Sequence, residues 1–308
     1  MKRSLLFICS AFFFSIQTYA QPKVEHKFYI PKKGEIELFS GIDFNYRDIL
    51  LDNQYEFLIN LTPGLKWYIG KHTMIAAQAL IPIANDYGHY YKRPRINLLT
   101  ASHEMCLLNK LALKPSFGLF TQERWGFDLK AMYPINQWLA LEGEVGYTGF
   151  MSMADGWKMS KLNRIFATGG IDVFVPNVNL QFRMIGGRFL NTDNGFYFEG
   201  MRHFTNCTVG VYAQYSDIAV LSDGYNGGFK VVMVIPPYKR KHGRVTFRPS
   251  TNFRLTYNMN ADPFSAKTYN TDPEQNERHF WFSPNILYWG ANTIYDYINY
   301  ENGNDIQQ

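Results

Sequence analysis

The stretches that decide the fold are Glu35–Arg47, EIELFSGIDFNYR, and Gln54–Ile69, QYEFLINLTPGLKWYI. In both, every second residue is uncharged and most of these residues are apolar, whereas the charged residues, such as Glu35 and Glu37, occupy the other parity. Successive side chains of a strand point to opposite faces of the sheet. This period of two therefore predicts long strands with one apolar face and one polar face.

The alternation recurs along the rest of the chain. It is evident in Phe127–Tyr133, Leu139–Tyr147, Leu180–Met184 and Val245–Arg248. Between Gln21 and Asn258 no segment shows the 3.6-residue period of an amphipathic helix. The predicted class is all-β.

The connections between the predicted strands alternate in length. Short ones are expected at 70–72, 108–110, 136–137, 177–179 and 205–206, and longer ones at 84–93, 151–163 and 218–227. Short turns at one end and long loops at the other are typical of outer-membrane barrels. We therefore predict an antiparallel transmembrane β-barrel over residues 21–258, with about 12 strands (10–14), short periplasmic turns and longer extracellular loops.

A soluble β-sandwich or a lipocalin-like barrel would also alternate. Two features favour the membrane barrel. The strands are longer than the 5–6 residues usual in globular sheets. Aromatic residues, which make up 17% of the chain, gather near the predicted strand ends, as in interfacial girdles.

The N-terminus predicts export. Lys2 and Arg3 precede an apolar run, and Thr18-Tyr19-Ala20 offers small residues for a signal peptidase that cuts between Ala20 and Gln21. A membrane anchor and lipidation at Cys9 are the alternatives. Export and strand pattern together predict an outer-membrane location.

Composition narrows the class of protein further. The formal net charge is +5 and the basic residues form one short cluster, so no nucleic-acid partner is expected. After the predicted signal peptide only Cys106 and Cys207 remain, which excludes a disulfide scaffold and leaves open whether the two pair.

An abrupt border lies within Asn226–Arg248, NGGFKVVMVIPPYKRKHGRVTFR. The apolar run ends at two prolines, which cannot donate to a strand ladder, and a basic turn follows. We expect this turn at the periplasmic side, in contact with the headgroups of the outer-membrane lipid. Its basic residues are Lys239, Arg240, Lys241 and Arg244.

The same region, with the preceding GFYFEGMRHFTNCTVGVYAQYSD (195–217), resembles the YjbH-like (GfcD-related) family of exopolysaccharide-associated outer-membrane proteins. The resemblance covers Asn194–Asn258, and the chain looks like a shorter, one-barrel version. It implies a role in exopolysaccharide or capsule export or assembly, with polysaccharide and periplasmic export components as partners. Its motifs are structural, and it implies no active site.

The polar parity defines candidate residues for the barrel interior. These side chains carry both signs of charge, so they can pair across the interior or line a channel. The candidates are Glu35, Glu37, Asp43, Arg47, Glu56, Lys66, Asp128, Lys130, Arg183, Lys230, Arg248 and Arg254.

No sequence pattern identifies catalytic residues, a cofactor site or a metal site. His103-Glu104 lacks the second histidine of a zinc-protease helix, Ser152 lacks the glycines of a nucleophile elbow, and Glu142 with Glu144 fits an interior charge ladder. We therefore expect a non-enzymatic barrel. A structural barrel of a secretion or adhesion apparatus is the alternative, and a hydrolase with its site at the rim is a further one.

The tail, residues 259–308, lacks the long alternation and is rich in Asn, Asp and Tyr. A plug, a further strand pair, a periplasmic extension or disorder all fit this composition.

Overall fold

The computed structural model describes residues 33–49, 54–70, 72–86, 88–108, 111–136, 138–153, 156–175, 178, 180–203, 207–218, 224–234, 243–249, 252–258 and 267–273. The predicted signal peptide lies outside these residues, as do Lys239, Arg240 and Lys241 of the predicted basic turn.

The prediction of an all-β protein is confirmed. Within the described residues 18 strands form a single sheet, and the one helical element is the 3-10 turn η1 (His89–Lys92). The strands are β1 (Ile36–Ser40), β2 (Ile42–Ile49), β3 (Gln54–Leu61), β4 (Gly64–Tyr68), β5 (Thr73–Asn85), β6 (Arg95–His103), β7 (Met105–Leu107), β8 (Leu111–Phe120), β9 (Arg124–Asn136), β10 (Leu139–Ser152), β11 (Lys158–Met159), β12 (Arg164–Val175), β13 (Leu180–Arg188), β14 (Asn194–His203), β15 (Cys207–Ser216), β16 (Tyr225–Val234), β17 (Val245–Pro249) and β18 (Asn252–Asn258).

Several of these strands are pieces of one longer strand. β1 and β2 are separated only by Gly41, β3 and β4 by Thr62 and Pro63, and β6 and β7 by Glu104. The long predicted strand at 35–47 is therefore present with a short break at Gly41.

Most neighbours in the sheet are antiparallel hairpins in sequence order. The longest ladder joins β9 to β10. Two pairings depart from this pattern, because β1 runs parallel to β17 and β18 runs parallel to β2. The prediction of antiparallel pairing is therefore confirmed for most of the sheet, and these two parallel contacts are the exceptions.

Successive connections fall at alternate ends of the sheet. The connections β4–β5, β7–β8, β9–β10, β12–β13 and β14–β15 are short and share one end, which we call the short-turn end. The opposite long-loop end carries the β5–β6, β10–β12 and β15–β16 connections. The tight connections 121–123 and 189–193 also lie at the long-loop end, so loop length is not strictly segregated.

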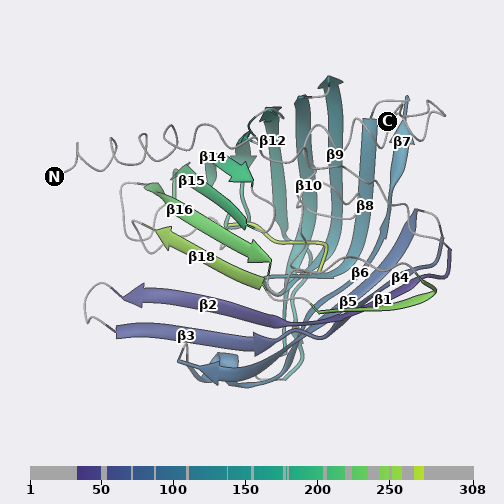
Figure 1. Ribbon diagram of the computed structural model, residues 1–308, viewed down its shortest axis with the longest axis vertical. Helices are drawn as coiled ribbons and strands as arrows, with labels where there is room; N and C mark the ends of the chain where they lie inside the picture. The colour runs from purple at the N-terminus through teal and green to yellow at the C-terminus, as the bar shows by residue number, and fades with distance from the viewer. Residues whose placement is uncertain are drawn as a thin grey trace.

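The sheet is strongly curved (Figure 1). Strands β9, β10 and β12 lie side by side in one part of it, and β2, β3 and β18 run at a steep angle to them in another part. The distribution of apolar and charged side chains is the reverse of that in a soluble protein. Large apolar side chains on many strands, such as Phe127, Val145 and Ile165, are exposed, whereas charged ones such as Glu37, Lys114 and Glu199 are buried. In the described part of the chain no helix is long and apolar enough to cross a membrane.

Candidate functional site: the polar interior and the segment Lys267–Pro273

The predicted interior residues fall into three groups. Buried side chains are those of Glu35, Glu37, Asp43, Lys66 and Asp128. Lys130, Arg183 and Lys230 are partly buried. Arg47, Glu56, Arg248 and Arg254 belong to β2, β3, β17 and β18, but their side chains lie outside the described set.

Of the predicted basic turn, the described member is Arg244, which is exposed and immediately precedes β17. Cys106 lies on β7 and is partly buried, whereas the side chain of Cys207 on β15 lies outside the described set.

One charge network joins strands β10, β13, β14 and β16. Arg183 donates from Nε and Nη2 to the two carboxylate oxygens of Glu142, both at 2.7 Å. Glu199 accepts from Lys230 and, at 2.8 Å, from the hydroxyl of Tyr197. Charged bonds of this two-pronged kind are stronger than neutral ones, so the network ties together strands that are not neighbours in the sheet.

The ion pair between Arg183 and Glu142 depends on a glycine in the strand between them. The two residues stand on β13 and β10, with β12 between them. A Cβ atom on Gly170 would lie 2.3 Å from the carbonyl oxygen of Met184 and 3.2 Å from Oε1 of Glu142. The missing side chain therefore lets the bridge cross the intervening strand.

A segment of the tail, Lys267–Pro273, is buried against the polar face. Lys267 Nζ donates to Oδ2 of Asp193 at 2.9 Å and to Ser216 Oγ at 3.1 Å. The carbonyl oxygen of Lys267 accepts the N–H of Leu190 at 3.1 Å. Asp193 and Leu190 belong to the β13–β14 connection, so this part of the segment lies at the long-loop end.

The other end of the segment reaches the body of the sheet. Asp272 accepts from Lys114 on β8 at 2.8 Å and 2.9 Å, one bond to each oxygen. Glu104 approaches the same ammonium group at 3.5 Å. Lys114, Asp272 and Glu104 are all buried, and a buried charge without such partners would be strongly unfavourable.

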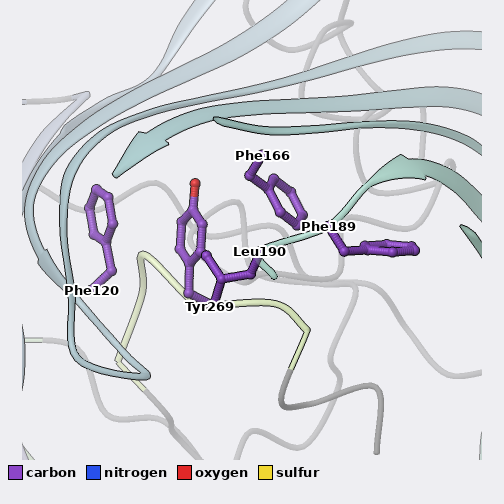
Figure 2. Packing of buried hydrophobic residues seen from close by; sticks show 5 residues of the cluster. All are labelled: Phe120, Phe166, Phe189, Leu190 and Tyr269. Atoms are coloured by element: carbon purple, nitrogen blue, oxygen red, sulfur yellow. The ribbon is translucent and has the colours of Figure 1, made fainter. Parts of the chain in front are cut away.

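Tyr269 sits between these two anchors in an aromatic cluster. Its ring stacks on Phe120 with 5.2 Å between centroids and 7° between planes, and it meets the Phe166 ring edge-on at 5.4 Å. Figure 2 shows the ring between Phe120 and Phe166, with Leu190 beside it. The hydroxyl group donates to Oδ2 of Asp128 at 2.8 Å.

Two features fix this orientation of Tyr269. Burial, and secondly the charge of Asp128, raise the pKa of the Tyr269 phenol, so the hydroxyl group stays protonated and remains a donor. A Cβ atom on Gly146 of β10 would lie 1.7 Å from that hydroxyl oxygen. Only glycine leaves room for the hydroxyl group at this position.

Residues 270 and 271 add further contacts with the sheet. Asn270 exchanges bonds with Thr121, whose N–H donates to the Asn270 carbonyl at 3.1 Å and whose Oγ1 accepts the Asn270 N–H at 2.8 Å. Thr271 accepts from Lys130 at its hydroxyl and from Thr100 at its carbonyl, both at 3.0 Å. Each residue from 267 to 272 except Thr268 thus has an identified polar partner on the sheet side.

The rim of the long-loop end is tied by Asp217. Its carboxylate accepts the backbone and side-chain N–H groups of Asn194 at 2.7 Å and 2.9 Å. These bonds lower the pKa of Asp217. The start of β14 is therefore fastened to the end of β15 next to the Lys267 contact.

The residues considered for catalysis have structural surroundings. His103 is exposed and its Nδ1 lies 2.9 Å from Thr73 Oγ1, whereas Glu104 points to the buried face. Glu142 is engaged by Arg183, Glu144 lies 3.9 Å from Lys130, and Ser152 is buried in β10. In the described residues no group of three His, Cys, Asp or Glu side chains could hold a metal ion.

Comparison with known proteins adds no assignment. No protein-family model matches the chain, and no curated protein is similar enough to count as a match.

Several residues of this site did not emerge from the sequence. Lys114, Glu104 and Glu199 have the polar parity of their strands, so a longer application of the alternation would have found them. The segment Lys267–Pro273 has no period of its own, and Lys114 and Asp272 are 158 residues apart in the chain. The absence of alternation in the tail was the one sequence feature that set this segment apart from the strands.

Proposed function

We propose that the sheet closes into a β-barrel that spans the outer membrane. The observation that carries the proposal is the reversed polarity, with large apolar side chains exposed and ion pairs buried. Lipid is the solvent that stabilises such an exterior, and lumenal side chains of membrane barrels are characteristically polar. The parallel pairings of β1 with β17 and of β18 with β2 further support it, because they join the two ends of the strand order.

Within that setting we propose a non-enzymatic role in the export or assembly of a surface polysaccharide. Support comes from the resemblance of Asn194–Asn258 to the YjbH-like family and from an interior rich in hydroxyl, amide and charged groups. Periplasmic export components and the polysaccharide itself are the proposed partners. Arg244, exposed beside β17, belongs to the surface that we assign to the lipid headgroups or to such a component.

A structural barrel of a secretion or adhesion apparatus is a second candidate. The filled interior favours it, because Lys267–Pro273 and the Arg183–Glu142 bridge occupy space that an open channel would need. Such a barrel would need no route through its interior.

Two experiments test the proposal. The full chain, produced in a Gram-negative host, should appear in the outer-membrane fraction and migrate differently on gels before and after heating. Recovery as a soluble periplasmic protein would refute the barrel. Deletion of the gene should reduce surface polysaccharide or trap it in the periplasm, and normal display in the deletion strain would transfer support to the secretion or adhesion role.

A further inference from the structure

The segment Lys267–Pro273 contacts the sheet without being a strand of it. Its described backbone hydrogen bonds to other main-chain groups are those from Leu190 N–H to the Lys267 carbonyl and from Thr121 N–H to the Asn270 carbonyl. By comparison, β9 and β10 pair continuously along their length. The segment can therefore separate from the sheet without breaking any strand ladder.

The contacts that hold the segment are mostly polar. Lys267 pairs with Asp193, Asp272 pairs with Lys114, and the Thr271 hydroxyl accepts from Lys130. Tyr269 contributes the main apolar contact of the segment. Polar groups of this kind can exchange one partner for another ligand, whereas loss of a buried charged partner without replacement is costly.

From Tyr269 to Asp272 the segment presents to the sheet a flat ring, hydroxyl groups and a carboxylate, and an acidic sugar chain carries rings, hydroxyl groups and carboxylates as well. Lys267, which pairs with Asp193, is outside this set. Tyr269 offers a flat ring stacked on Phe120 and a hydroxyl group bonded to Asp128. Thr271 offers an aliphatic hydroxyl group to Lys130, and Asp272 offers a carboxylate to Lys114. An aromatic platform with a few convergent charged groups is a usual way to hold and orient a polar ring-shaped ligand.

We propose that Lys267–Pro273 is an internal plug that occupies a binding track for an acidic saccharide chain and must withdraw before such a chain can enter. The track extends from Asp193 at the long-loop end, past Phe120 and Asp128, to Lys114. This proposal rests on the proposed function, because a saccharide reaches the track only if the sheet encloses a membrane-spanning interior.

The test uses changes in the plug alone, so the sheet keeps its own residues. The release variant is Tyr269→Ala/Asp272→Asn, which removes the stacked ring, the bond to Asp128 and the charge opposite Lys114. Lys114 then keeps Glu104 as a partner. The control is wild-type protein measured in parallel.

A reversible lock makes the test sharper. The exchange of bonds between Thr121 and Asn270 brings their backbones together. We choose this pair for the lock because a disulfide requires Cα atoms that are only roughly 4.4–6.8 Å apart. We would add Thr121→Cys/Asn270→Cys to the release variant, with Cys106→Ser and Cys207→Ser to remove the native thiols. Oxidation should hold the plug in place and reductant should free it.

The readout is ion current through the purified full chain in a planar lipid bilayer. Wild-type protein should be closed almost all the time, and the release variant should be open at least about tenfold more often, since the loss of one charged contact changes such an equilibrium by about tenfold or more. Oxidation of the locked variant should close it again. Equal open time in wild-type and release variants would overturn the plug.

The ligand class is tested with trigalacturonate, an acidic sugar oligomer, and maltotriose, a neutral one. Trigalacturonate should block the current of the release variant at least tenfold more strongly than maltotriose, and Lys114→Gln in that variant should remove the difference. Equal block by both sugars, or none, would overturn the acidic track. Heat-modifiable migration of each variant separates these outcomes from a failure of the barrel itself.

Discussion

Gly146→Ala is the substitution whose effect follows most directly from the structure. A Cβ atom at this position would lie 1.7 Å from the Tyr269 hydroxyl oxygen and 2.9 Å from Cζ of the ring. Ordinary contact between such atoms begins at about 3.4 Å, so the hydroxyl group has to retreat by about 1.7 Å. No such retreat is compatible with its 2.8 Å bond to Asp128.

The magnitude follows from that lost bond. A hydrogen bond to a charged group contributes about 1.5–3 kcal/mol, and each 1.4 kcal/mol changes an equilibrium about tenfold. We therefore expect the Gly146→Ala change to raise the released fraction of Lys267–Pro273 by about 10- to 100-fold. The strand itself should tolerate alanine, since Gly146 is not in a left-handed conformation.

The assay measures how fast a buried thiol becomes accessible. Thr271→Cys, placed in the Cys106→Ser/Cys207→Ser background, buries a cysteine in the segment because Thr271 is fully buried. Its labelling rate by a membrane-impermeant maleimide reports the released fraction. The matched control is Gly143→Ala on the same strand, where a Cβ atom would meet its nearest neighbour, Thr168 O, at 3.7 Å.

A double-mutant cycle tests the cause. With Tyr269→Ala in place no hydroxyl group or ring remains to collide, so Gly146→Ala should have no further effect on labelling. Equal labelling of the Gly146→Ala and Gly143→Ala proteins would refute the reasoning, as would a full Gly146→Ala effect in the Tyr269→Ala protein.

Two further predictions address the exterior and the interior. Val145→Arg, at a position that is 55% exposed on β10, should prevent assembly, because arginine facing lipid near the midplane costs about 2–4 kcal/mol. The control Leu108→Arg, in a turn and 92% exposed, should be tolerated. Equal recovery of both folded proteins from the outer membrane would contradict a lipid-facing surface. Arg183→Met should destabilise the protein by about 3–5 kcal/mol, because it leaves Glu142 without the two bonds at 2.7 Å. The Glu142→Gln/Arg183→Met double variant should recover part of that loss in denaturant unfolding, and a double variant as unstable as the sum of the single ones would argue against the bridge.

The all-β class was predictable because a period of two needs only local sequence. In stretches such as Glu35–Arg47 the chain separates its charges from its apolar residues at every step, and Glu35, Glu37 and Asp43 are indeed buried. The ends of the strands were also marked locally, by glycine, asparagine and proline. The parallel contact of β18 with β2 was not predictable, because it depends on where the last strand arrives after all the others have paired.

The alternation of apolar and polar residues could not predict which polar side chains pair with each other. The alternation places Glu142 and Arg183 on the polar parity, but their bond crosses β12 and requires the bare backbone at Gly170. Register along three strands decides that contact, and a register shift of one residue would move each side chain to the opposite face. The sequence of any single strand does not contain this information.

The tail contributes a close carboxylate partner for Lys114. Lys114 is buried, and Glu104, a residue between β6 and β7, approaches its ammonium group at 3.5 Å. The carboxylate of Asp272 is closer, with bonds of 2.8 Å and 2.9 Å. Because burial of an ammonium group is costly unless its partners are close, Lys114 favours any state in which a carboxylate occupies the position of Asp272. The same lysine that holds the segment in place would therefore favour an incoming acidic chain over a neutral one once the segment has left.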